Sequence, residues 1–106
     1  MNASSGLDPV IHAPARLQIA AVLAGVSEAE FAAVRDLVGV SDSVLSKHLS
    51  ALAEAGYVRL RKAAANGRQR TWLTLTRDGA RAFRAHVAAL QALAASAATA
   101  ERVAAE

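Results

Sequence analysis

The chain has 106 residues and a mass of 10.9 kDa, the size of one small domain. It contains no cysteine, which excludes a disulfide framework, a thiolate zinc site and a cysteine nucleophile. The net charge of +3 is unevenly distributed, because residues 41–86 hold nine basic and three acidic residues while the rest of the chain is net acidic. A basic charge concentrated in one continuous segment favours a polyanionic partner.

Alanine fills 28 of the 106 positions, and aromatic residues make up only 4% of the chain. A chain of this length buries roughly 60–70% of its unfolded surface. Since few of the buried side chains are large, we expect a thin core and a protein that dimerises. No stretch approaches the roughly 20 apolar residues of a membrane span, and the N-terminus lacks a basic region followed by an apolar one. We therefore expect a soluble, cytoplasmic protein that does not contact a membrane.

The first predicted element follows residues 1–7, which we expect to form a flexible N-terminal tail. Asp8-Pro9 has the form of a helix start, with an N-cap followed by proline at the first helical position. Pro14 is expected to restart or slightly bend this helix. Its apolar stripe ends at Gly25, which closes the element.

A second helix is predicted to begin at Ser27. The serine hydroxyl can accept a hydrogen bond from the amide three residues on, while Glu30 reaches back to the serine amide, which is the pattern of a capping box. Apolar residues at helical spacing continue to about Val38, and Gly39 ends the helix.

A third helix is predicted over residues 42–55, between a cap at Ser41 and a stop at Gly56. Its apolar stripe consists of Leu45, Leu49 and Leu52. The opposite stripe carries Ser43, Ser46, Lys47 and Ser50. A face of one lysine and three hydroxyl side chains is unusual for a merely solvated helix, which carries more glutamate and alternating charge.

The hydrophobic period changes from 3.6 to 2 in residues 57–62 and again in residues 71–76. This change predicts a two-stranded hairpin. The residues of its inner face are Val58, Leu60, Leu73 and Leu75. The connection over residues 63–70 contains the turn signal Asn66-Gly67.

A last helix is predicted from Arg77, capped by Thr76, to about residue 98. Alanines on several of its faces allow another helix to approach closely, so we predict a dimer interface with the N-terminal residues. The candidate interface residues are Val10, Ile11, Leu17, Phe83, Val87, Leu90 and Leu93. Residues 99–106 are expected to extend this helix or to fray.

Two helices joined by a short glycine-containing turn form a helix-turn-helix, and a hairpin directly after it makes a winged helix. The expected fold is mainly α with a two-stranded β-hairpin wing, in one domain over residues 8–98. A helix about 10–12 Å across fits the roughly 12 Å major groove of B-DNA. The candidate DNA-binding residues of the third helix are Ser41, Asp42, Ser43, Ser46, Lys47 and Ser50. Those of the wing are Lys62, Arg68 and Arg70.

Residues 40–49 (VSDSVLSKHL) and 52–58 (LAEAGYV) resemble the segment from recognition helix to wing in winged-helix transcriptional regulators. Thr71 and residues 75–79 (LTRDG) are similar to the short, single-domain MarR-like members. The resemblance implies a homodimer on a pseudo-palindromic DNA operator, usually acting as a repressor. The chain is shorter than a full MarR protein, which leaves open whether it has a small-molecule effector. The cysteines of ArsR-like metal sensors are absent.

The alternative function is a winged helix used for protein–protein contact in a transcription or replication assembly, but the lysine–serine face and the basic wing favour DNA. His48 is expected either to contact a phosphate or to pack against a neighbouring element. His12, His86 and Glu101 lack the clustered spacing of a zinc site, so neither a metal nor another cofactor is expected. A serine near His48 has no group that orients the base, and we expect no catalytic residues and no enzymatic activity.

Overall fold

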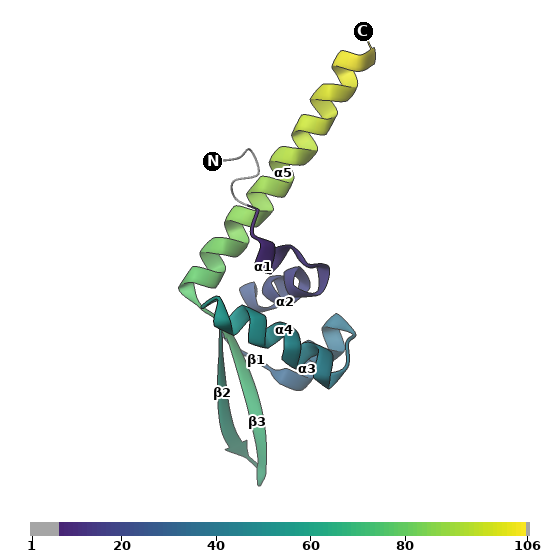
Figure 1. The fold of residues 1–106 in the computed structure, drawn as a ribbon. Helices are drawn as coiled ribbons and strands as arrows, with labels where there is room; N and C mark the ends of the chain where they lie inside the picture. Colours follow the sequence, from purple (N-terminus) through teal and green to yellow (C-terminus); the bar gives the residue numbers. More distant parts are fainter. Residues whose placement is uncertain (1–6, 106) are drawn as a thin grey trace.

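The computed structural model describes residues 7–105, so most of the predicted tail, residues 1–6, lies outside the described residues, as does Glu106. Five helices and three strands follow one another along the chain (Figure 1). The helices are α1 (Pro9–His12), α2 (Pro14–Ala24), α3 (Phe31–Val38), α4 (Asp42–Glu54) and α5 (Arg77–Ala105). The strands are β1 (Ala29–Glu30), β2 (Val58–Ala65) and β3 (Arg68–Leu75).

One small core lies between α1, α2, α3, α4, the sheet and the first turns of α5. Its buried residues are Ile11, Ile19, Leu23, Val34, Leu45, Leu49, Leu52, Val58 and Leu73. All three leucines of the predicted stripe on α4 belong to it, which confirms the face that this helix turns inward. The opposite face of α4 is therefore free to meet a partner.

The N-terminal helix is divided in two at Ala13. Asp8 caps α1, because its Oδ1 accepts a hydrogen bond from the Val10 amide at 2.8 Å, as predicted. Ala13 has an extended conformation (φ −59°, ψ 132°), since a residue before proline is disfavoured in the α region. Pro14 then opens α2 as its first residue, so the proline restarts the helix rather than bending it.

The predicted capping box at Ser27 is wrong. Residues 29–30 form the short strand β1, which pairs antiparallel with β3, and α3 begins only at Phe31 without a side-chain cap. Glu30 lies in register with Trp72, a partner that is distant in the sequence. The sheet therefore has three strands in the order β1-β3-β2, where a two-stranded hairpin was predicted.

The wing is a long hairpin with a two-residue turn. Asn66 and Gly67 both have positive φ (53° and 76°), which is the conformation that an Asn-Gly hairpin turn adopts. Pairing extends to the ends of the strands, where Ala65 lies opposite Arg68. The connection expected over residues 63–70 is therefore mostly paired strand. The predicted pairs are confirmed, with Val58 opposite Leu75 and Leu60 opposite Leu73, but Leu60 is 43% exposed and does not belong to the inner face.

The last helix is longer than the body of the domain needs. Thr76 caps it through a 3.0 Å hydrogen bond from the Gly79 amide, as predicted. The residues of α5 from 91 to 105 are all exposed. In Figure 1 this half of α5 and the tip of the wing project from the domain in opposite directions, which gives the molecule its length of 67 Å. No helix among the described residues is long and apolar enough to cross a membrane.

Candidate nucleic-acid interface

The outward face of α4 carries the predicted polar side chains. Leu45, Leu49 and Leu52 anchor the opposite face in the core, so helical spacing alone directs these side chains to the surface. Exposed on this face are Ser43, Ser46, Lys47 and Ser50. The structure brings together the candidate residues of the third helix, and their contact with DNA stays a prediction.

Two further candidates, Ser41 and Asp42, serve the start of α4. The Ser41 hydroxyl accepts a hydrogen bond from the Val44 amide at 3.2 Å and so caps the helix. The Asp42 carboxylate lies 2.9 Å from Nη1 of Arg35, which belongs to the preceding helix. Arg35 also donates to Asp36 at 2.9 Å, and the hydrogen bonds to Asp36 and Asp42 raise the pKa of this guanidinium above its ordinary value. The ion pair between Arg35 and Asp42 therefore links α3 to the first residue of α4.

A groove of about 560 Å³ separates α4 from the hairpin. Ser46 and Ser50 line it from the helix, and Lys62 and Thr71 line it from the hairpin. Lys62 is exposed on this edge of the wing, opposite Thr71 in the strand pairing. The structure therefore places this wing lysine beside the polar face of α4.

The two wing arginines occupy different environments. Arg68 follows the turn directly and is exposed at the tip of the wing. Arg70 is half-buried, and its Nη1 lies 2.7 Å from Oε2 of Glu30 in β1. The sequence grouped the two as equivalent wing residues, but only Arg68 has a guanidinium without an ion pair among residues 7–105.

A second ion pair joins the same two regions. Arg61 of β2 contacts Glu28 through two nitrogens, with Nη2 at 2.8 Å and 2.9 Å from the carboxylate oxygens. Glu28 and Glu30 thus each neutralise one wing arginine. Sequence reasoning missed both pairs, because the separations of 33 and 40 residues become contacts only once β1 joins the sheet.

His48 packs against α2 instead of facing outward from α4. Its Nδ1 lies 3.3 Å from Nη1 of Arg16, and the guanidinium can only donate, so this nitrogen accepts. Burial, followed by the charges of Arg16 and Lys47, lowers the pKa of His48. Arg16 also donates to the Val10 carbonyl, so it links α1, α2 and α4. Of the two alternatives for His48, the structure favours packing.

A polar cluster joins the start of α1 to α5 and to the base of the wing. The amide of Asp8 donates to Nδ1 of His86 at 3.0 Å, so the proton of this neutral imidazole is on Nε2. That nitrogen lies 3.1 Å from Nδ1 of His12, which accepts from it. His86 is fully buried, and burial, followed by the charge of His12, lowers its pKa. The cluster is structural and was not recognised from the sequence.

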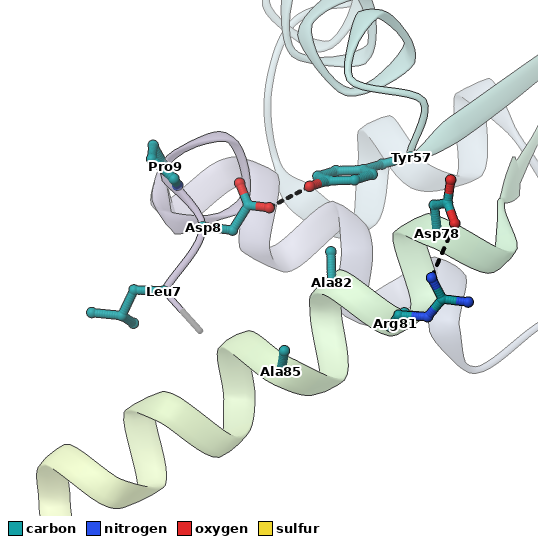
Figure 2. A pocket seen from close by; sticks show the side chains of 8 residues that line it. All are labelled: Leu7, Asp8, Pro9, Tyr57, Asp78, Arg81, Ala82 and Ala85. Atoms are coloured by element: carbon teal, nitrogen blue, oxygen red, sulfur yellow. Dashed lines mark hydrogen bonds and ion pairs between the residues drawn. The ribbon is translucent and has the colours of Figure 1, made fainter. Parts of the chain in front are cut away.

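Tyr57, directly before β2, completes this cluster. Its hydroxyl donates to Asp8, and this hydrogen bond, with burial, raises the pKa of Tyr57 to about 12. Figure 2 shows the Asp8 and Tyr57 side chains pointing toward each other and joined by this hydrogen bond. Both line an open hollow of about 610 Å³, to which Asp78 and Arg81 of α5 also contribute.

A metal site does not form from the three residues considered in the sequence. His12 and His86 are in contact, but Glu101 lies 15 residues further along α5, about 22 Å away along the helix. Within residues 7–105 no group of three histidine, aspartate or glutamate residues is arranged to hold a metal ion.

The predicted dimer-interface residues divide into three groups. Ile11 is fully buried in the core of its own protomer and has no surface left for a partner, so the prediction that it contacts a partner is wrong. Half-buried, with part of their surface free, are Val10, Leu17, Phe83, Val87 and Leu90. Leu93 is 53% exposed on the projecting part of α5.

Residues 15–94 match a family described as "Winged helix DNA-binding domain". The uncharacterized protein MJ0432 of Methanocaldococcus jannaschii is 30% identical over 78 residues, which is 74% of this chain and 85% of MJ0432. A transcriptional regulator homologue from Pyrococcus horikoshii OT3 has a similar structure (TM-score 0.78, 24% identity, 82% of this chain and 86% of that one). So has ZitR of Lactococcus lactis, a zinc-responsive MarR family member (TM-score 0.59, 19% identity, 83% of this chain and 60% of that one).

Proposed function

The chain belongs to the family of winged-helix DNA-binding domains, and we propose that it is a sequence-specific transcriptional regulator that binds its operator as a homodimer. The membership confirms the resemblance to winged-helix regulators noted in the sequence. The finer proposal rests on one observation, which is that the exposed polar face of α4 and the basic hairpin border the same groove. Two elements that we propose to contact DNA in different ways therefore lie side by side.

In the proposed complex α4 enters the major groove. Ser43, Ser46 and Ser50 are short donors and acceptors for base edges, and Lys47 is long enough to reach guanine O6 or N7. The wing then lies along the flanking backbone or minor groove. Its Lys62 and Arg68 supply phosphate contacts, which position the domain but do not read sequence.

The homodimer is proposed from the uncovered part of α5. Leu93 and Val103 are 53% and 66% exposed on the segment of α5 from residue 91 to 105, all of which is exposed in the described part of the chain. A second copy of α5 would cover these side chains and could approach closely over the alanines between them. A rigid interface of this kind would hold two α4 helices about 34–36 Å apart, one turn of DNA, as a palindromic operator requires. We propose that binding to such an operator represses transcription.

The test is selection of bound sequences from a random duplex pool, combined with sedimentation of the free protein. We expect a palindromic consensus and a dimeric mass. If each protomer neutralises about three to five phosphates, affinity should fall roughly 10³–10⁵-fold from 50 to 200 mM salt. Enrichment of no sequence, or affinity that is independent of salt, would contradict DNA binding; a single half-site bound by a monomer would contradict the dimer.

A further inference from the structure

The edge strand β1 is acidic and lies beside the basic wing. Glu30 is in register with Trp72 of β3, and Arg70 is two residues before Trp72. Residues two apart on a strand point to the same face, so the Glu30 and Arg70 side chains share one face of the sheet and meet diagonally. Their ion pair is a consequence of strand register.

This ion pair is better formed than an ordinary surface pair. The Arg70 and Glu30 side chains are only 34% and 25% exposed, and the 2.7 Å separation is that of a short, charge-assisted hydrogen bond. Partial burial reduces the screening by water that makes exposed pairs weak. Glu30 therefore holds the Arg70 guanidinium in a defined position.

That position is at the proposed DNA interface. Glu30 and Arg70 both line the groove between α4 and the hairpin. Both also line a neighbouring hollow of about 310 Å³, to which Arg35 and Arg68 contribute. An anionic backbone passing between α4 and the wing would run close to this pair.

Resting on the proposed function, we propose that Glu30 is a positioning residue that limits sequence-independent DNA affinity, because it retains Arg70 and keeps it from becoming an additional phosphate ligand. Phosphates are present at every DNA sequence, so a released guanidinium would strengthen binding to all sequences alike. Glu30 is part of the same chain and is always next to Arg70, whereas a phosphate must compete for it. The wing still has Arg59, Lys62 and Arg68, which make no ion pair among residues 7–105.

The experiment is Glu30→Gln in the full chain, a change that keeps the size of the side chain and removes its charge. Binding to a selected operator and to an unrelated duplex is measured between 50 and 200 mM salt. One additional phosphate contact steepens the salt slope by about 0.9 per protomer, or about 1.8 per dimer. The variant should then lose about 12-fold more affinity for the unrelated duplex than the wild type over this fourfold rise in salt. At 50 mM salt it should bind both duplexes more tightly than the wild type, and the ratio of the two affinities should stay unchanged.

The matched control is Glu54→Gln, which makes the same change in charge at an exposed residue that has no ion pair within the described part of the chain. Arg70→Gln, alone and together with Glu30→Gln, provides the second test. If Arg70 is the group that is released, Glu30→Gln should have no more effect than Glu54→Gln when Arg70 is already replaced.

The outcomes separate the two proposals. If the wild type binds no duplex, the proposed function fails. If the wild type binds DNA but Glu30→Gln and Glu54→Gln have the same salt slope and the same affinity for each duplex, DNA binding stands and the role of Glu30 is refuted. A steeper slope in Glu30→Gln that persists without Arg70 refutes it as well.

Discussion

Substituting Gly79 tests how closely α5 is fitted against the base of the wing. Alanine normally stabilises a helix relative to glycine by about 0.5–1 kcal/mol. Here a Cβ at residue 79 would lie 2.2 Å from the Tyr57 carbonyl oxygen and 2.8 Å from Cδ1 of Leu75. The carbonyl cannot move aside easily, because it accepts a 2.9 Å hydrogen bond from the Thr76 amide. The steric term should therefore reverse the usual sign.

The magnitude follows from the overlap. The first turn of α5 must move by more than about 1 Å to bring this contact to van der Waals distance, and overpacking of this kind costs about 1–3 kcal/mol. We expect Gly79→Ala to lower the free energy of unfolding by about 2 kcal/mol, which corresponds to a fall in Tm of roughly 8–16 °C for a domain of this size. Because Tyr57 leads into β2, the shift should also weaken operator binding.

Gly25→Ala is the matched control. A Cβ at Gly25 would have Val22 O as its nearest neighbour at 3.7 Å, an ordinary contact, and its φ of −90° suits any residue. Its stability should stay within about 0.5 kcal/mol of the wild type. Thermal and urea unfolding followed by circular dichroism measure both variants. A Gly79→Ala protein as stable as Gly25→Ala would refute the reasoning about this contact.

Three further predictions concern reading, assembly and pH. Lys47→Ala should weaken operator binding by about 1–3 kcal/mol and relax the base preference at one operator position. The control Arg102→Ala removes the same charge near the end of α5 and should leave the selected sequence unchanged. If Lys47→Ala also leaves the selected sequence unchanged, Lys47 contacts a phosphate and does not read a base. Leu90→Asp should abolish the dimer in sedimentation while the helical signal is largely retained, and a dimer that persists contradicts the α5 interface. Because the pKa of His86 is lowered in the folded protein, the unfolded chain takes up a proton at this residue at a higher pH than the folded chain does. The contribution of His86 to the free energy of unfolding should therefore be constant above the unfolded pKa of 6.5 and fall as the pH decreases below it. Unfolding at pH 7.5 and 5.5 checks this, since the wild type should lose more stability than His86→Gln, and equal losses would contradict it.

The elements that the sequence predicted well carry local signals. Ser41 and Gly56 delimit α4, and both bound the observed helix, because capping and positive φ depend only on neighbouring residues. Asn66-Gly67 likewise specifies the turn of the wing without reference to the rest of the chain. The polar face of α4 could be predicted for the same reason, since helical spacing alone sets it opposite the leucines.

The parts that could not be predicted depend on contacts between distant residues. Strand β1 has two residues and no pattern of its own, and it exists because β3 offers it an edge to pair with. The buried His86 is 78 residues from the Asp8 amide that holds it, so no spacing in the sequence could reveal the pair. Arg70 differs from Arg68 for the same reason, because its partner lies on that unpredicted strand.

The failed capping box and the paired arginine have a common physical origin. A glutamate at residue 30 cannot both reach back to the Ser27 amide and contact Arg70, so the two local structures exclude each other. Pairing with β3 directs the Glu30 side chain to Arg70, and α3 is left without a side-chain cap, a loss of about 1 kcal/mol for a typical helix. The half-buried ion pair and the strand pairing of β1 offset that loss. A conflict between local preference and observed structure is expected at functional sites, and this one lies at the groove between α4 and the wing.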